Sequence, residues 1–406
     1  MHTIEDIIRL AVSVPLGDPT QDGCIWGLPL LIWGNPGIGK STRIKKAAQS
    51  LKCQAGIILP AGRLPEDFAG LPVQDGKGGV NLVSILGAVR LLSEIGEGIM
   101  FIDEINTARA AVQASLLGFV HDRRSGDTLM PGGVRFISAA NPVETAAGGH
   151  PLEVPLANRF IHYDMDKPSP EEWGNFLIGT RREEEDVLSL FEIEKKVKEK
   201  WHNAWLEVAP IFAGFIHRFP KALEEIPEAG SPNRSKAFPT PRTMEWAARA
   251  ATTCHILHIK GTLEGAILRA CIGAGAAEEF ISYRQKENLP TPKEVLQNGF
   301  APDKIRLDRS YAVYTALSTY ITTLPKKEAQ VAAAIKAWAI FDEGCRAGQA
   351  DLLYESVRDL INADLGSVGG EQLARASEPV ISRYGDRLTK NAKKAYDYKK
   401  IAEATK

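Results

Sequence analysis

A glycine-rich segment that ends in lysine and serine carries the clearest chemistry in the chain. Its sequence, GNPGIGKST, occupies residues 34–42 and follows an apolar run over residues 28–33. It fits the pattern G-x-x-x-x-G-K-[ST], in which glycines let backbone N–H groups converge on phosphate oxygens and the next helix points its positive end at them. Lys40 would neutralise the β and γ phosphates, and the Ser41 hydroxyl would ligate Mg²⁺. The residues expected to line this phosphate loop are Gly34, Asn35, Pro36, Gly37, Ile38, Gly39, Lys40, Ser41 and Thr42.

Two acids, Asp103 and Glu104, end the most apolar run of the chain, GIMFIDE. An acid at this place emerges at the carboxyl end of a strand, where open α/β sheets bind ligands. Asp103 is expected to hold Mg²⁺, mostly through water, and Glu104 to orient and polarise the attacking water. The alternative is that one of them caps the helix that follows.

Three more polar residues lie where they could reach a nucleotide. Asn141 follows another apolar run and could hold the attacking water or contact the γ phosphate, or it could form an ordinary Asn-Pro turn with Pro142. Arg159, near the end of a predicted short helix, is either a solvated surface residue or a residue that stabilises phosphoryl transfer in a neighbouring subunit. Arg242 begins a helix after two prolines and could reach the nucleotide or merely begin that helix.

These residues need a parallel α/β sheet to bring them together. The chain alternates short apolar runs with helical patterns as far as about Asp166, which predicts a parallel sheet with helices on both faces. The predicted strands cover residues 29–34, 55–61, 98–104 and 134–142, with one last strand after Arg159. The predicted helices cover residues 40–51, 82–95 and 109–122.

The second half of the chain has a different character. After residues 166–173 the strand-like runs give way to helical periodicity, and the proline-rich stretch 289–295 is typical of a second boundary. We therefore predict an α/β nucleotide-binding core over residues 1–165, a helical lid over 166–290 and a further helical region over 291–406. The sequence assigns no role to this last region.

Composition excludes several classes of protein. Among 406 residues, 49 Lys and Arg nearly balance 50 Asp and Glu, so no overall basic field draws the chain to nucleic acid or membrane. The five cysteines form no CxxC pair, which argues against a zinc site or a disulfide framework and favours a reducing, cytoplasmic setting. No signal peptide and no apolar stretch of roughly 20 residues is visible, so a membrane anchor is not expected.

The order of the segments GNPGIGKS, IMFIDE, SAANP, PLANRF and TPRT resembles the AAA+ ATPases, and within them the MoxR-type group. The segment LPEDFAGLP (64–72) and the helix-rich insert at 82–95 are similar to that group too, and the resemblance covers residues from about 25 to 250. It implies that Asn141 is the sensor-1 residue, Arg159 the trans-acting arginine finger and Arg242 the sensor-2 arginine of the lid. It also implies a ring, usually a hexamer, with ATP and Mg²⁺ at subunit interfaces. Arg123 and Arg124 are weaker candidates for the trans arginine.

The resemblance also suggests what the nucleotide drives. The segment LPEDFAG has one aromatic residue, Phe68, but no aromatic-hydrophobic-glycine triplet of the kind that grips a threaded polypeptide. We therefore expect ATP-driven remodelling of a protein partner, as is proposed for MoxR-type proteins that act on partners with von Willebrand A domains. The alternative is an AAA+ motor of a nucleic-acid-directed complex, favoured only by the basic stretch 386–400 with Tyr396 and Tyr398. A switch without turnover is a third possibility, against which Glu104 argues.

Overall fold

A computed structural model describes residues 2–77, 79–142, 149–178, 188–286, 289–363 and 365–388. The chain divides into two compact units, residues 1–202 with 222–279 and residues 203–221 with 280–406. This division falls within two long helices and so differs from the three regions expected from the sequence, whose boundaries at 165 and 290 stay predictions.

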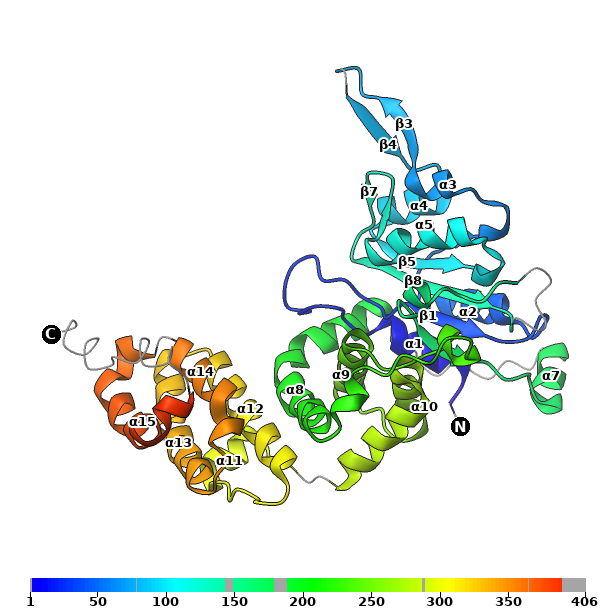
Figure 1. The fold of residues 1–406 in the computed structure, drawn as a ribbon. Coiled ribbons are helices and arrows are strands. Elements are labelled where there is room, and N and C mark those ends of the chain that lie inside the picture. Colours follow the sequence, from blue (N-terminus) through cyan, green and yellow to red (C-terminus); the bar gives the residue numbers. More distant parts are fainter. Residues whose placement is uncertain are drawn as a thin grey trace. The chain divides into compact units, whose positions relative to one another are not determined.

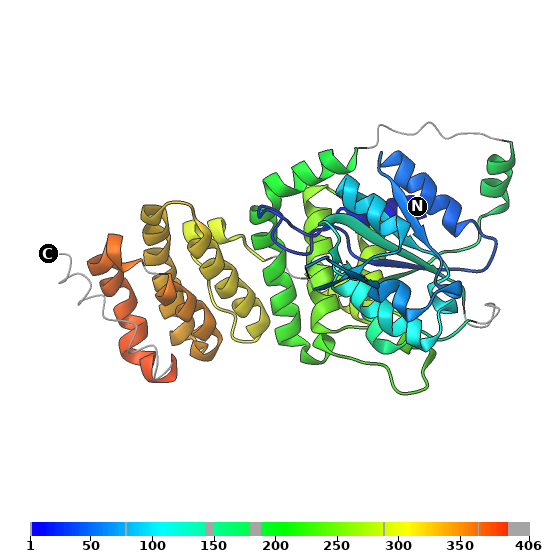
Figure 2. The same cartoon turned by 90° about the horizontal axis from the view of Figure 1, so that it is seen from above.

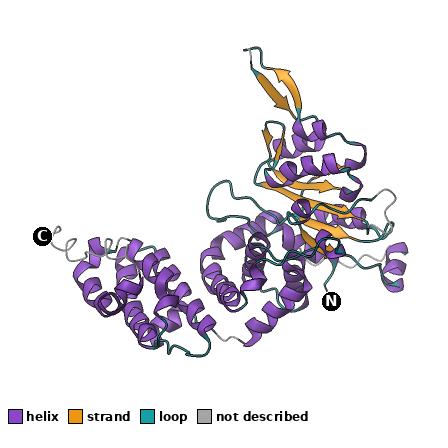
Figure 3. Ribbon diagram, in the orientation of Figure 1, coloured by secondary structure: helices purple, strands orange, loops and turns teal. Residues whose placement is uncertain are grey.

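A five-stranded parallel sheet forms the centre of the first unit (Figure 3). Its strands are β1 (Leu30–Trp33), β2 (Ala55–Ile58), β5 (Glu97–Ile102), β8 (Gly133–Ala140) and β9 (Ile161–Asp164). They lie in the order β2-β5-β8-β1-β9, and every neighbouring pair is parallel. The three central strands are buried almost throughout, which is why they read as continuous apolar runs. The fold class is confirmed, and each predicted strand is present, although the one predicted over 55–61 ends at Ile58 and is followed by a 3-10 turn at 60–62.

Helices pack on this sheet and complete the core. They are α1 (Ile4–Val12), α2 (Lys40–Ser50), α4 (Gly87–Ile95), α5 (Ala110–His121) and the short α6 (Val154–Ala157). Three aromatic side chains, Phe68, Phe119 and Phe136, meet edge to face in the core between β8 and α5. The helices predicted over 40–51 and 109–122 agree with α2 and α5 within one residue at each end.

The helix predicted over residues 82–95 is partly wrong. Its first residues belong to β4 (Val80–Val83), which pairs with β3 (Leu71–Gln74) in an antiparallel hairpin, and only α4 is helical. All eight residues of the two strands are exposed, and the hairpin extends away from the sheet in Figure 1. A four-residue strand with apolar side chains on both faces has no period that separates it from one turn of helix. The helix α3 (Pro65–Ala69) precedes this hairpin, and a second, small hairpin joins β6 (Arg124–Ser125) to β7 (Thr128–Leu129).

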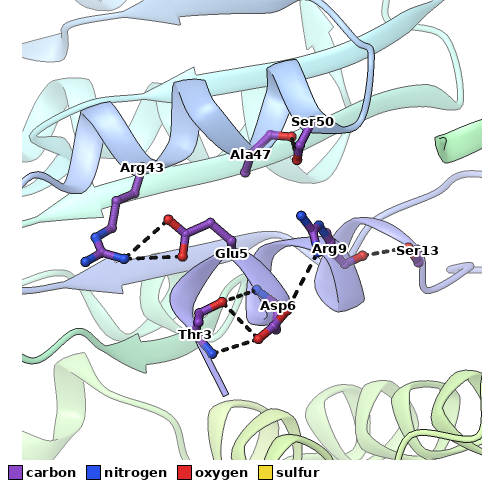
Figure 4. A network of polar contacts seen from close by, with 8 residues as sticks. All are labelled: Thr3, Glu5, Asp6, Arg9, Ser13, Arg43, Ala47 and Ser50. Carbon is purple, nitrogen blue, oxygen red and sulfur yellow. Dashed lines mark hydrogen bonds and ion pairs between the residues drawn. The ribbon is translucent and has the colours of Figure 1, made fainter. Parts of the chain in front are cut away.

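The N-terminal helix α1 is tied to the helix that follows the phosphate loop (Figure 4). Thr3 and Asp6 form a capping box that begins α1. Glu5 then forms an ion pair with Arg43 of α2 at 3.3 Å. The helix α1 also packs against α9 (Pro241–Ile256).

The rest of the first unit is helical. Besides α9 it contains α7 (Pro170–Leu177), the beginning of α8 (Leu190–Arg218) and most of α10 (Thr262–Lys286). No strand follows β9 in the described residues, as the sequence predicts. The fully buried guanidinium of Arg135 on β8 forms an ion pair with Glu194 of α8 and so joins the sheet to this helical part. Short 3-10 turns occupy residues 60–62, 105–107 and 232–235 of this unit, and one more, at 220–223, begins in the second unit.

The second unit is entirely helical in its described residues (Figure 2). It contains the ends of α8 and α10, a 3-10 turn at residues 350–353, and the helices α11 (Pro292–Asn298), α12 (Leu307–Thr323), α13 (Lys327–Arg346), α14 (Tyr354–Asn362) and α15 (Gly366–Leu388). Tyr314, Trp338 and Phe341 lie at the centre of its own hydrophobic core. An independent core explains why this region forms a separate unit.

Further expectations concern membrane-spanning helices, metal clusters, cysteines and the basic C-terminal stretch. Over the described residues, no helix is long and apolar enough to cross a membrane, and no cluster of three or more His, Cys, Asp or Glu is arranged to hold a metal. All five cysteines are unpaired. Most of the basic stretch 386–400, with Tyr396 and Tyr398, lies outside the described residues.

Candidate functional site

The phosphate loop joins β1 to α2 through a tight turn that needs glycine. Gly37 and Gly39 have φ values of 79° and 92°, a backbone region that favours glycine. Gly34 is buried so closely that a Cβ there would lie 2.5 Å from the Ile38 side chain. The helix α2 begins at Lys40, and no side chain caps it and no acid lies in its first turn. The local sequence thus leaves the positive end of α2 free to face an anion.

Lys40 connects the loop to a neighbouring strand. Its Nζ donates to the main-chain oxygens of Gly34 at 2.6 Å and Asn35 at 3.0 Å, and to Oδ1 of Asn141 at 2.7 Å. Burial lowers the pKa of the Lys40 ammonium, while the charges of Asp103 and Glu104 partly oppose this shift. Among the described residues, the hydrogen-bond acceptors of this half-buried ammonium are neutral oxygens, and phosphate oxygens can take over its donors.

Ser41 and Asp103 bring the loop and the acid pair together. The Ser41 hydroxyl donates to Oδ2 of Asp103 at 2.7 Å, although the two residues are 62 positions apart in the sequence. Asp103 follows the last residue of β5, and its N–H donates to the main-chain oxygen of Ile58 at 2.9 Å. A hydroxyl and a carboxylate in contact beside a phosphate loop fit the oxygen ligands that Mg²⁺ takes while it keeps several waters.

Glu104 occupies a strained position at the surface. Its φ and ψ of 53° and 43° are left-handed, which is uncommon for a non-glycine residue and is often found at functional sites. The Glu104 carboxylate is exposed and forms no capping hydrogen bond. The residue at the N-cap of α5 is Arg109. Glu104 precedes the 3-10 turn 105–107 without capping it through its side chain, and the Asp103 carboxylate accepts from Ser41 and from the Glu104 N–H, so the structure does not support the helix-cap alternative for either acid.

Asn141 lies directly beyond β8 and is nearly buried. Its side chain accepts from Lys40, while its main-chain N–H and oxygen pair with the side chain of Asn106 at 3.3 and 2.7 Å. Sequence reasoning missed Asn106. The available signal was an amide two residues after Glu104, within a stretch that is otherwise apolar or small.

Arg159 and Arg242 both hydrogen-bond to main-chain oxygens at the short helix α6 and the residue that follows it. Arg159 follows α6 and donates to the Pro155 oxygen at 2.7 Å, and Arg242 of α9 donates to the Asn158 oxygen at 3.3 Å. Burial and then the charge of Arg242 lower the pKa of Arg159, and both arginines help burial to lower the pKa of His121. In the described part of the chain, neither arginine forms an ion pair with a carboxylate or a hydrogen bond to the phosphate loop.

The two weaker candidates for a trans arginine differ in their surroundings. Arg123 is buried, donates to the main-chain oxygens of Pro131 and Val134, and lies over the Phe136 ring at 5.3 Å. Burial lowers its pKa to about 10. Its guanidinium is therefore part of the core and cannot reach a neighbouring subunit, so that expectation is wrong for Arg123. Arg124, in β6, is exposed.

Comparison with protein-family models finds a match in the N-terminal half of the chain. Residues 29–160 match the AAA domain of the dynein-related subfamily. The match includes the phosphate loop, the acid pair, Asn141 and Arg159, whereas Arg242 lies beyond it. No curated protein matches the chain.

One solved structure similar to the chain is a crystal structure described as a "putative ATPase" from Cytophaga hutchinsonii ATCC 33406. The two are 17% identical, and the match covers 70% of this chain and 88% of that chain with a TM-score of 0.43.

Proposed function

We propose that this chain, which contains an AAA domain of the dynein-related subfamily, is a MoxR-like ATPase that works as an oligomeric ring, with six subunits as the expected number. It hydrolyses ATP with Mg²⁺ and uses the energy to remodel or activate a protein partner. In this proposal Lys40 and the loop hold the phosphates, Ser41 and Asp103 hold Mg²⁺, and Glu104 orients the attacking water.

One observation carries the ATPase proposal. Four side chains from three different segments, Lys40, Ser41, Asp103 and Asn141, are hydrogen-bonded in two pairs at the carboxyl edge of one sheet. One pair joins the loop after β1 to the residue after the neighbouring strand β8, and the other joins it to the residue after β5, two strands away. A bound nucleotide with its metal would take the place of these contacts, because it offers oxygen ligands to Lys40 and a cation to Asp103.

The arginine pair supports hydrolysis at a subunit interface. The positive charge of Arg242 acts against that of Arg159, while Asp122 partly compensates, and in the described residues the hydrogen bonds of both guanidinium groups go to main-chain oxygens. We therefore propose that Arg159 and Arg242 together contact the γ phosphate bound by the next subunit. Arg242 would then act in trans, and not on the nucleotide of its own subunit.

A protein partner is supported by the β3–β4 hairpin. Apolar side chains occupy both faces of this two-stranded ribbon and are at least 40% exposed: Leu71, Val73, Val80, Leu82 and Val83. A protruding surface of this kind suits contact with another protein. A von Willebrand A domain in the partner rests on the resemblance to the MoxR-type group alone.

Mixing two inactive variants tests the ring and the trans arginine together. Arg159→Ala should bind ATP normally and lose turnover by about 10³-fold or more, because trans arginines contribute that much to phosphoryl transfer. Lys40→Ala should bind no ATP but keep an intact arginine. In a mixture, each Lys40→Ala subunit offers its arginine to an intact loop, so part of the activity should return and should fade on dilution.

The control replaces Arg123, which the structure places in the core. A mixture of Lys40→Ala and Arg123→Lys should hydrolyse ATP no faster than Arg123→Lys does by itself. Failure of Arg159→Ala and Lys40→Ala to complement at any ratio, with both folded and co-assembled, would refute the trans assignment.

A further inference from the structure

A fully buried amide lies between the acid pair and Asn141. Asn106 has 0% of its surface exposed and belongs to the 3-10 turn Ile105–Thr107, directly after Glu104. Its Nδ2 donates to the Asn141 main-chain oxygen at 2.7 Å, and its Oδ1 accepts from the Asn141 N–H at 3.3 Å. A single side chain thus pairs with both peptide groups of one residue.

The ends of the strands explain why this pairing is needed. The parallel strands β5 and β8 pair side by side, with β5 ending at Ile102 and β8 at Ala140. Asn141 lies one residue past the end of β8, and the chain of β5 has by then turned away at Glu104. A side-chain amide carries one acceptor and one N–H donor side by side, as a peptide group of a strand does. Asn106 therefore extends the sheet ladder by one residue and satisfies backbone groups that would otherwise be buried without partners.

The same turn fixes two groups of the site at once. The left-handed backbone of Glu104 reverses the chain so that its own carboxylate lies at the surface while Asn106 points inward. Because Asn106 holds the backbone of Asn141, it also sets where the Asn141 side chain meets Lys40 Nζ, at 2.7 Å. The positions of Glu104 and Asn141 are thus coupled through one amide.

We propose that Asn106 is a positioning residue for nucleotide hydrolysis: it holds Asn141 in register with Glu104 and touches neither nucleotide nor water itself. This inference rests on the proposed ATPase function. Asn106 lies outside the phosphate loop and the acid pair. Its inferred role is in turnover and not in nucleotide binding.

Two variants separate turnover from binding. Asn106→Asp keeps the shape but loses the N–H donor that faces the Asn141 oxygen, and Asn106→Ala removes both groups. Each should lower kcat by about 10-fold or more, as the loss of groups that orient catalytic residues generally does. KM and the Kd for a fluorescent ATP analogue should stay within about 2-fold, because the phosphate loop is unchanged.

A double-mutant cycle shows whether Asn106 acts through Asn141. If it does, the variant with both Asn106→Ala and Asn141→Ala should be no slower than Asn141→Ala alone. Losses in kcat that multiply instead would mean that Asn106 acts independently of Asn141 and would overturn the inference.

The matched control is another buried amide that uses both its donor and its acceptor. Gln349 donates to the Asp303 oxygen at 2.8 Å and accepts from the Tyr314 hydroxyl at 2.9 Å, and all three residues belong to the second unit. Gln349→Ala should lower the melting temperature without changing kcat per folded molecule. An equal fall in kcat would show that any lost buried amide has this effect and would overturn the inference.

Measuring Glu104→Gln beside the Asn106 variants distinguishes failure of the positioning role from failure of the proposed ATPase function. If wild-type hydrolysis depends on Glu104 but folded Asn106 variants keep the wild-type kcat, the positioning role is refuted and the ATPase stands. If the wild type shows no hydrolysis that depends on Glu104, the proposed function itself is refuted. If neither Asn106 variant folds, Asn106 is only a core residue and the inference is also overturned.

Discussion

The carboxyl edge of the sheet and the interior of the second unit hold their polar groups in different ways. At the sheet edge, Lys40 and Asp103 contact neutral groups, Asn141 and Ser41, that a nucleotide and a metal can replace. In the second unit, the nearly buried Asp308 is paired with two arginines, Arg306 at 2.8 Å and Arg218 at 3.4 Å. Burial alone would raise the pKa of Asp308, but the hydrogen bond and charge of Arg306 hold it below its ordinary value.

This difference in partners distinguishes side chains that can bind a ligand from side chains that stabilise the fold. A group with exchangeable neutral partners can change its contacts at little cost, whereas breaking a buried ion pair leaves a charge without compensation. Arg159 and Arg123 both donate to main-chain oxygens, and burial distinguishes them: Arg123 lies in the core, whereas Arg159 is partly exposed. The predictions below test this contrast, from the largest expected effect to the smallest.

Glu104→Gln should have the largest effect on turnover and little effect on binding. The amide keeps the shape but cannot accept the proton of the attacking water, so kcat should fall by about 10²–10⁴-fold. Fluorescent-nucleotide titration should give the wild-type Kd. Glu97→Gln, at the exposed other end of the same strand, is the control and should hydrolyse ATP normally. Wild-type turnover in Glu104→Gln would deny the acid any role in the reaction.

Phe341→Ala should affect stability and leave the site intact. The side chain is fully buried in the core of the second unit, and removing it should lower the free energy of unfolding by about 3–5 kcal/mol. Ile305→Ala, at a side chain that is 88% exposed, should change stability by less than about 0.5 kcal/mol. Urea unfolding measures both, and a fluorescent nucleotide should bind the folded Phe341→Ala protein as it binds the wild type. Weaker nucleotide binding would show that the two kinds of region are not separate.

His162 should make stability depend on pH. It is buried, accepts from Trp33 Nε1 at 2.9 Å and donates to the Ala157 oxygen at 2.9 Å, which is possible only for the neutral ring. Burial lowers its pKa from 6.5 to about 4. The unfolded chain therefore takes up the proton first, so this contribution, about 3 kcal/mol, is complete above pH 6.5 and is lost as pH falls through 4.

Urea midpoints between pH 7 and pH 4 measure this loss. His162→Phe should flatten the curve. A slope that survives in His162→Phe would assign the pH dependence to other groups.

The ion pair between Glu5 and Arg43 should contribute least. Both side chains are partly exposed, so Glu5→Gln should cost less than about 1 kcal/mol and the cost should shrink in high salt. A double-mutant cycle with Arg43→Gln isolates the pair. A coupling energy above about 2 kcal/mol would mean that this partly exposed ion pair stabilises the protein as much as a buried contact does. That result would contradict the expected difference between exposed and buried groups.

The sequence by itself determined the parallel sheet, the phosphate loop and the acid pair. These features are local: a loop of fixed glycine spacing lies between one strand and one helix, and each buried strand is a continuous apolar run. The segment from Lys40 to Thr42 carries its chemistry in consecutive residues, so no distant contact is needed to recognise it.

Only the tertiary structure decided how the other groups are used. Arg123 and Arg159 are the same residue type near the ends of helices, yet one lies inside the core and the other beside Arg242, 83 positions further along the chain. The amide of Asn106 next to the acid pair could have marked it as a candidate, but its role depends on where β8 ends and so could not be predicted from its neighbours. Burial and pairing between distant segments arise from packing, and a single sequence has no local period that records them.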